Sequence, residues 1–514
     1  MKESTRRRAR RRERRSGSPP GSLKRPINQL PLVTVLSDEG VQIIHQASMR
    51  LLKEQGVMVL DYPAARETFR EHGAQVEDDL VRIDEDTLMH FVRQAPSSFT
   101  QLARNYDNKV QIGGNHMVFA PVYGPPFVSD LDGGRRRASI EDFRNFIRLA
   151  YLCPHMHHSG GTLVEPNDVD VRERHLDMLL AHITLSDKAF MGSVTHADNA
   201  RDTVTLARIL LGADAIEENP AAISIINASS PLRFDDRMLG ALEVYARARQ
   251  AVIVTPFIIA GAMSPSSVAA TLAQQNAEAL FGICYAQMLN SGTPCVYGSF
   301  LANIDMKSGA PCFGTGENAL ALYATAQMAR HYSLPYRSGG NLTAARTPGA
   351  QAGYESAATM LPTVQAGTNF VLHAAGWLEG GLISSYEKFI LDAEMCGMLV
   401  RMVGGITLSD EDFAWDAFDE VGPGNHFLGS EHTMRHYTTA FYQHTVFSMD
   451  NYELWEEKGS PDSYKLANSR WKQMLKEYEP PTLDEAIAEE MQAFVGQRRN
   501  ELRDRKPRTE WRTS

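Results

Sequence analysis

The sequence lacks the cysteine patterns that hold disulfides or structural zinc. It has five cysteines in 514 residues, and no two of them are closely spaced: Cys153, Cys284, Cys295, Cys312 and Cys396. The paired Cys-x-x-Cys ligands of a zinc site are therefore missing. Isolated thiols of this kind are typical of a reducing compartment, and we expect a cytoplasmic protein.

Long hydrophobic runs are also missing. No stretch approaches the roughly twenty apolar residues of a membrane-spanning helix, and no apolar segment follows the basic N-terminal residues as it would in a secretory signal. The formal net charge of −10 argues against general binding to nucleic acid. We expect a globular protein with neither a membrane nor a nucleic-acid partner.

Common catalytic fingerprints are absent as well. The sequence has no G-x-S-x-G and no P-loop, so serine hydrolysis and phosphoryl transfer have no local support. His155, His157 and His158 lie close together, but no Cys, Asp or His elsewhere has the spacing that would complete a metal site. We predict no directly bound metal.

Composition along the chain predicts four regions. The first sixteen residues, MKESTRRRARRRERRS, are strongly basic and run into Gly-Ser-Pro-Pro-Gly, which predicts a disordered tail over 1–30. Residues 31–138 mix helical and strand patterns and predict an N-terminal α/β lobe. Residues 139–450 form the main body. The charged region 451–514 predicts a C-terminal helical extension that serves packing or subunit contacts in a homo-oligomer.

The main body alternates strand and helix patterns. Strands are predicted at 157–164, 190–195, 222–228, 251–259, 294–300, 334–339 and 369–373, with an eighth between Gly404 and Leu428. Helices are predicted at 173–186, 198–211, 235–248, 266–290, 316–331 and 351–366. This repeat of βα units predicts a TIM (β/α)₈ barrel. The competing doubly wound sheet is weakened by the lack of a glycine-rich fingerprint after the first strand.

In a barrel, catalytic side chains lie at the carboxyl ends of the strands. His373 ends one predicted strand, and Trp377 follows it in a glycine-rich loop. Aromatic residues could wall a pocket for a quaternary ammonium through their ring quadrupoles, although packing is the commoner role for such rings. The candidates are Tyr297, Phe300, Phe313, Tyr354, Trp377 and Tyr386.

Long motifs in the sequence resemble a known family. They are PCVYGSFLANIDMKSGAPCFGTGE (294–317), AQAGYESA (350–357), LHAAGWLEGGL (372–382), EKFILDAEM (387–395) and GPGNHFLGSEHTMRHY (422–437). They are similar to the trimethylamine methyltransferase family, whose members are corrinoid-dependent TIM-barrel enzymes. The trimethylamine enzymes carry pyrrolysine near the place where residues 344–347 stand here. This chain has ordinary residues there, so it resembles the non-pyrrolysine branch that includes glycine betaine methyltransferases.

The resemblance implies transfer of a methyl group from a quaternary amine to the Co(I) of a corrinoid carried on a partner protein. His373 is the predicted catalytic residue, on the substrate or corrinoid face. His426 is expected at the mouth where the corrinoid docks. The remaining predicted substrate-binding residues are polar: Asn303, Glu317, Asn341 and Gln351.

Two alternative functions remain open from the sequence. The protein could bind quaternary amines without transferring a methyl group, as a sensor or carrier. It could also be a carboxylate-based lyase or hydrolase, with Glu317 and Asp305 as acid and base.

Overall fold

The computed structural model describes residues 25–504, and the predicted tail over 1–30 lies mostly outside them. The protein has a mixed α/β fold around a parallel sheet whose hydrogen-bonded order is β9–β10–β12–β13–β16–β17–β6. The strands are β6 (Val118–Phe119), β9 (Phe190–Met191), β10 (Ala222–Ala228), β12 (Ala251–Ala260), β13 (Cys295–Gly298), β16 (Tyr336–Arg337) and β17 (Phe370–Val371). β14 (Phe300–Ile304) extends β13 alongside β12 and pairs with β15 (Pro311–Cys312).

The prediction of alternating βα units on a parallel sheet is confirmed, but the strand pairings do not close a barrel. Within residues 25–504 no strand ladder joins β6 to β9. The predicted strand between Gly404 and Leu428 is wrong, because this segment forms α14 (Asp410–Phe413) and α15 (Trp415–Val421). β17 pairs instead with β6, which comes from the region predicted as a separate lobe.

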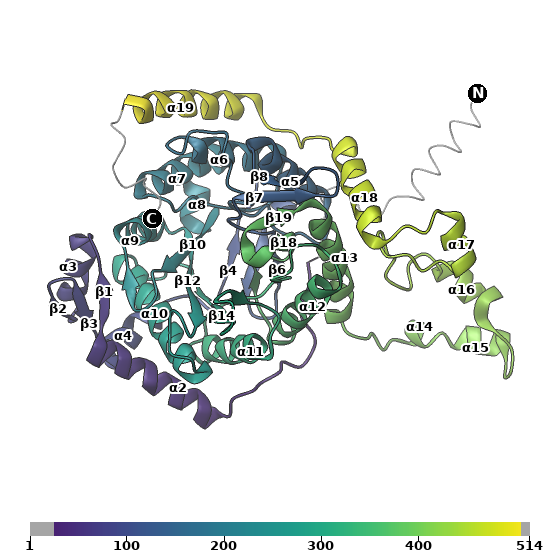
Figure 1. Cartoon of the computed structure of the whole chain (residues 1–514), viewed down its shortest axis with the longest axis horizontal. Coiled ribbons are helices and arrows are strands. Elements are labelled where there is room, and N and C mark those ends of the chain that lie inside the picture. The colour runs from purple at the N-terminus through teal and green to yellow at the C-terminus, as the bar shows by residue number, and fades with distance from the viewer. Residues whose placement is uncertain (1–24, 505–514) are drawn as a thin grey trace.

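Helices surround the sheet (Figure 1). They are α5 (Ile140–Leu152), α6 (Arg174–Leu185), α7 (Ala197–Leu211), α8 (Ala213–Glu218), α9 (Asp236–Arg247), α10 (Val268–Leu289), α11 (Gly316–His331), α12 (Ala350–Gln365) and α13 (Tyr386–Val403). α10 is buried along nearly its whole length, and its N-cap is Ser267, whose side chain accepts from the Ala270 N–H. It is buried all round because the sheet covers one side and the N-terminal elements cover the other.

The N-terminal elements form a small layer outside α10. They are α2 (Asp38–Arg50), β1 (Val57–Val59), α3 (Pro63–Glu71), β2 (Gln75–Glu77), β3 (Leu80–Arg82) and α4 (Glu85–Val92). The ring of Phe69 stacks on that of Phe281 with centroids 4.4 Å apart. A hairpin of β4 (Ser98–Gln101) and β5 (Val110–Gly113) packs its apolar side chains against the amino ends of the parallel strands.

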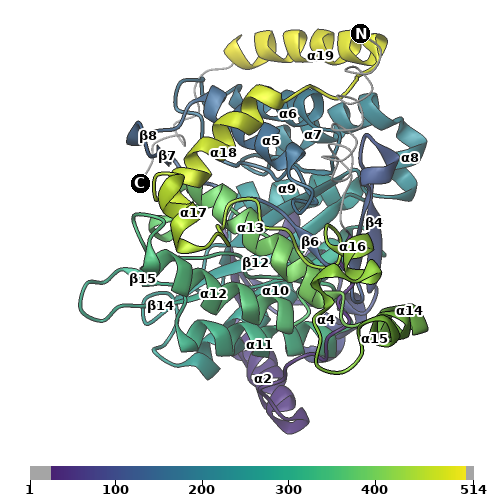
Figure 2. The same ribbon diagram turned by 90° about the vertical axis from the view of Figure 1, so that its right-hand side faces the viewer.

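The C-terminal region is helical as far as residue 504. It contains α16 (Glu431–His436), α17 (Tyr452–Glu457), α18 (Ser463–Glu477) and α19 (Glu485–Asp504). α18 packs along α13, and α19 packs against α7. α14, α15 and α16 lie at the side of the molecule, beyond α13 (Figures 1 and 2). Among the helices of residues 25–504, none is both long enough and apolar enough to cross a membrane.

Candidate functional site

Four ring-bearing side chains meet beyond the carboxyl ends of the strands, and we call Phe300, Phe313, His373 and Trp377 the aromatic cup. The ring centroid of Trp377 lies 4.5 Å from that of His373, 5.5 Å from that of Phe313 and 5.7 Å from that of Phe300. All four side chains are buried. The sequence predicted Phe300, Phe313 and Trp377 as substrate-binding residues and His373 as the catalytic residue, and the structure brings the four together.

Glycines let the surrounding loops approach the cup closely. Gly381 has φ +94°, and a β-carbon there would lie 2.5 Å from Cη2 of Trp377. Gly314 follows Phe313 with φ +71°, and a β-carbon there would lie 2.5 Å from the Cα of Glu355. Larger residues would push the loops outward, because both positions combine left-handed backbone with no free space.

His373 adopts an unusual backbone conformation for a residue with a side chain. Its φ is +64°, and its carbonyl accepts from the Asn341 N–H at 3.0 Å. Nδ1 accepts from the backbone N–H of Tyr123 at 3.2 Å, so the ring proton belongs on Nε2. Burial and the nearby charge of Arg337 hold the pKa of His373 well below its ordinary value. The ring is therefore a neutral N–H donor at pH 7.

Arg337 is a buried cation beside the cup that sequence reasoning missed. Its guanidinium carbon lies 5.3 Å from the centroid of Phe300, and Nη1 donates to the Ser299 carbonyl at 3.2 Å. Nε has no hydrogen-bond partner, and no carboxylate of residues 25–504 forms an ion pair with this side chain. Burial lowers the pKa of Arg337 to about 9, so the group stays charged at pH 7. A buried cation without an anion is costly, and the site is electrostatically incomplete.

A series of hydrogen bonds through Thr343 to Glu355 holds the indole of Trp377 in place. Its Nε1–H donates to the Thr343 carbonyl at 3.1 Å. Thr343 in turn donates from Oγ1 to the carboxylate of Glu355, which also accepts from the Ala344 N–H at 2.8 Å. Glu355 therefore positions Trp377 without touching it.

A buried ion pair lies beneath the cup. Lys388 and Asp392 are one helical turn apart on α13 and form a salt bridge. Asp392 also accepts from the Gly376 N–H at 2.9 Å, just before Trp377. Lys388 reaches Ser356 at 2.9 Å and the Asn341 carbonyl. Burial raises the pKa of Asp392 and lowers that of Lys388, so each charge depends on the other.

Asn341 supports the cup from below rather than lining it with a free amide. Its Nδ2 donates to the Ala374 carbonyl at 2.7 Å, and its Oδ1 is buried without a partner. Its side chain is fully buried.

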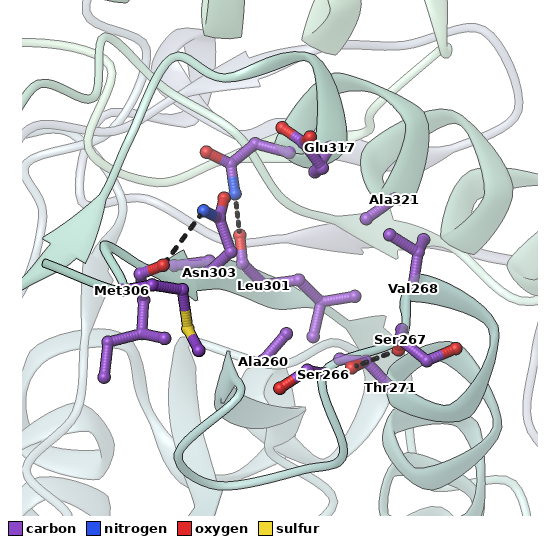
Figure 3. Close-up of a pocket in the computed structure, with 13 residues that line it drawn as sticks. Ala260, Ser266, Ser267, Val268, Thr271, Leu301, Asn303, Met306, Glu317 and Ala321 are labelled. Atoms are coloured by element: carbon purple, nitrogen blue, oxygen red, sulfur yellow. Dashed lines mark hydrogen bonds between the residues drawn. The ribbon is translucent and has the colours of Figure 1, made fainter. Parts of the chain in front are cut away.

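Two predicted polar residues face a different hollow. Asn303 and Glu317 line a pocket of about 190 Å³ between β14 and the first turns of α10 and α11 (Figure 3). Successive side chains of a strand point to opposite faces, so Phe300 at the start of β14 joins the cup while Leu301 and Asn303 line this hollow. Asn303 is further tied to Thr315, which donates to its Oδ1 at 2.9 Å.

The structure places the other candidates away from the cup. Tyr297 is buried among helices, and its hydroxyl donates to Asn276 at 2.8 Å. Tyr386 stacks on Phe146 and lies tilted against Trp471. Gln351 and Tyr354 lie on the exposed face of α12, with Tyr354 80% exposed. His426 is exposed in the segment between α15 and α16.

Two of the three neighbouring histidines accept backbone hydrogen bonds within the protein. His157 Nδ1 accepts from the Phe119 N–H, and His158 Nδ1 accepts from the Gly160 N–H, each at 2.9 Å. Over the described part of the chain, no three His, Cys, Asp or Glu side chains are arranged to hold a metal ion. Asp305 lies in the exposed β14–β15 turn and binds Ser308, so it is not paired with Glu317 as an acid and base.

Comparison with known proteins decides the family. A family model described as trimethylamine methyltransferase matches residues 3–503. This chain belongs to the trimethylamine methyltransferase family. The resemblance seen in its motifs is therefore confirmed.

Curated relatives within the trimethylamine methyltransferase family have different names. Glycine betaine methyltransferase of Desulfitobacterium hafniense (strain Y51) is 44% identical, over 92% of this chain and 98% of that protein. Proline betaine:corrinoid methyltransferase of Eubacterium limosum is 30% identical, over 79% and 86%. Trimethylamine methyltransferase MttB of Desulfitobacterium hafniense (strain DSM 10664 / DCB-2) is 28% identical, over 90% and 94%.

Proposed function

We propose that this protein transfers a methyl group from a betaine, a quaternary ammonium that carries a carboxylate, to the Co(I) of a corrinoid protein. The single observation that carries the substrate class is the pairing of the aromatic cup with Arg337. Aromatic faces attract an N-methylated cation at about 0.5–2 kcal/mol per ring. The guanidinium of Arg337 has no carboxylate partner among residues 25–504, its Nε–H is unpaired, and its planar fork suits a carboxylate. The substrate named for the relative at 44% identity, glycine betaine, has both groups.

The reaction needs little acid–base chemistry. The carbon–nitrogen bond breaks with its electron pair left on nitrogen, so the leaving group is a neutral tertiary amine. Co(I) supplies the electron pair for the new cobalt–carbon bond. A neutral leaving group needs no proton, which agrees with a His373 that is uncharged at pH 7. The protein's task is to orient the methyl group and exclude water, and orientation alone contributes on the order of 7–11 kcal/mol.

Each residue of the site has a part in this proposal. Phe300, Phe313 and Trp377 hold the ammonium, and their attraction to it weakens as its charge is lost. Arg337 holds the carboxylate, and His373 donates from Nε2 to the substrate or to the corrinoid face. Asn341 and the Lys388–Asp392 pair keep these side chains in place.

We further propose that the parallel strands make a (β/α)₈ barrel, with residues 157–159 closing the gap between β6 and β9. The N–H groups of His157 and His158 donate to the Phe119 carbonyl at 2.9 and 3.2 Å, and residue 158 bridges Ala189 in parallel. These contacts support closure at a point where no strand ladder is formed. The cup would then lie at the carboxyl-terminal mouth, open to a docked partner.

The test is a reconstituted transfer assay. Purified enzyme, its cognate corrinoid protein, a reductant and glycine betaine should give the absorbance of methyl-cobalt together with dimethylglycine. Silence with glycine betaine, proline betaine and carnitine alike would overturn the proposal. Calorimetric binding of a betaine without transfer would instead support a non-catalytic binding protein.

A further inference from the structure

We propose that the arginine-rich N-terminal segment, residues 6–15, docks on an acidic, ring-bearing surface formed by residues 406–441 of the same chain. We call that surface the acidic arm. Neither feature takes part in the proposed methyl transfer. The inference rests on the exposure of the arm, on its charge, and on where the described chain begins.

The acidic arm exposes far more apolar surface than a packed segment does. Among its large apolar side chains, Ile406 is 86% exposed, Trp415 61%, Leu428 79% and Phe441 81%. Exposed apolar patches of this extent mark contact sites. Within residues 25–504 nothing covers these side chains.

Aromatic rings form a row along the arm. Phe413 stacks on Trp415 with centroids 5.8 Å apart, Trp415 lies 6.0 Å from Phe418, and Phe418 meets Phe427 at 5.4 Å. The rings contact one another and remain partly exposed. Flat exposed faces of this kind suit guanidinium groups, which stack on them and are weakly hydrated.

Carboxylates flank the rings. The arm has seven acidic residues and one arginine, Arg435, which is paired with Asp416 at 3.0 Å. Three of the acids, Asp410, Glu411 and Asp419, form no ion pair with any residue of 25–504. The acidic members are Asp410, Glu411, Asp412, Asp416, Asp419, Glu420 and Glu431. Such a surface repels an identical arm, a nucleic-acid backbone and an anionic membrane alike.

The N-terminal segment has the complementary composition. Residues 6–15 read RRRARRRERR and contain eight arginines and one glutamate. Arginine pairs with carboxylates in a two-pronged geometry and also stacks on rings, so one residue type matches both features of the arm. No other ten-residue stretch of the sequence has this density of positive charge.

Four residues after its start at Arg25, the described chain passes beside the root of the arm. The Gln29 N–H donates to the carbonyl of Val403, the last residue of α13, at 2.9 Å. Asn28 is fixed by its N–H to Asn115 and by its side chain to Val364, each at 2.8 Å. The residues between Arg15 and Arg25 can span roughly 30 Å when extended. A segment tethered so close has a high effective concentration at the arm.

Hydrogen–deuterium exchange on the full chain tests the inference. Replacing all eight arginines of residues 6–15 with glutamine should raise the exchange of the α14–α16 amides at least fivefold, because the covering segment no longer binds. The matched control, Arg50→Gln with Lys53→Gln on α2, removes exposed positive charge elsewhere and should leave that exchange unchanged. A synthetic peptide of residues 1–24 should restore protection to the tail variant.

The arm gives the reciprocal variant. Asp410→Asn, Glu411→Gln and Asp419→Asn together should raise the same exchange, and combining them with the tail variant should add little more. The inference would be overturned if the α14–α16 amides exchanged at the same rate in the tail variant as in the wild type. Protection that grows with protein concentration and survives in the tail variant would assign the surface to a second copy of the chain instead.

Discussion

The guanidinium carbon of Arg337 lies 5.3 Å from the ring centroid of Phe300, and Phe300 in turn lies 5.7 Å from Trp377. One buried positive group and a wall of rings therefore share a single site. The rings favour a cation, whereas Arg337 repels one, so a simple ammonium ion fits this site poorly. A zwitterion satisfies both, provided that its carboxylate points toward Arg337.

Arg337→Met should discriminate between substrate classes. Hydrogen bonds to charged groups contribute about 1.5–3 kcal/mol, so we expect KM for glycine betaine to rise about 10–100-fold. Tetramethylammonium has no carboxylate, so the low rate at which it donates a methyl group should not fall further in the variant. Arg337→Lys, which keeps the charge and loses the fork, should lie between wild type and Arg337→Met. Steady-state transfer assays check this, and an equal loss for both substrates would contradict it.

Trp377→Leu should weaken binding of the ammonium. The variant keeps an apolar side chain but loses the ring face, and a cation–π contact is worth about 0.5–2 kcal/mol. We expect betaine affinity measured by calorimetry to fall about 3–30-fold, with the folded state retained. Tyr106→Leu, an exposed aromatic replacement near β5, serves as the matched control and should bind as wild type. A neutral isostere of betaine should bind Trp377→Leu and the wild type with equal affinity.

The rate of transfer should be independent of His373 ionisation above about pH 6, because the pKa of this residue is held well below its ordinary value of about 6.5. The kcat/KM profile between pH 6 and 8 should therefore have the same shape in wild type and His373→Gln. A wild-type step near pH 6.5 that disappears in the variant would show a titrating histidine.

The same shift has a consequence for stability. A histidine whose pKa is lowered on folding takes up its proton more readily in the unfolded chain, so stability falls as pH drops through about 6.5. His373→Gln should lose less stability than wild type between pH 7 and pH 5. Denaturant titrations at the two pH values measure the difference.

Removing one partner of the Lys388–Asp392 pair should lower the free energy of unfolding far more than removing both partners. Asp392→Ala leaves the Lys388 amine buried without its partner, which costs about 3–5 kcal/mol of unfolding free energy. The double variant Lys388→Met/Asp392→Leu removes both charges and should recover most of that loss. Urea unfolding of the wild type, the single variant and the double variant measures their free energies of unfolding. A double variant that is no more stable than Asp392→Ala would mean that hydrogen bonds to Gly376 and Asn341 dominate.

Periodicity and turn signals predicted most of the main sheet and its helices. The predicted strand 222–228 and the predicted helix 316–331 coincide with β10 and α11. The two-residue strand β6 was missed, because a pair of residues after a glycine turn carries no periodicity. The segment 404–428 was mistaken for a strand, although Ser409 caps α14 through a reciprocal bond with Asp412.

The cup was partly predictable, since Phe300 and His373 end predicted strands and Phe313 and Trp377 stand in the glycine-rich segments that follow them. The polar residues were harder, because β14 continues past Phe300 and its alternation sends Asn303 to the opposite face. Arg337 follows Tyr336 in a short strand, and the hydroxyl of Tyr336 reaches Thr325 on the helical side. Alternation then turns Arg337 inward, which a sequence pattern of two residues could not reveal.

The pairing of β6 with β17 joins segments almost half the chain apart. During synthesis, β6 cannot pair with β17 until the ribosome has translated residue 371. Nascent chains shorter than this expose an unpaired edge, and such edges recruit other strands. Because this pairing links distant segments, we expect it to form late in folding, and we expect fragments that end before residue 370 to aggregate more readily than the full chain.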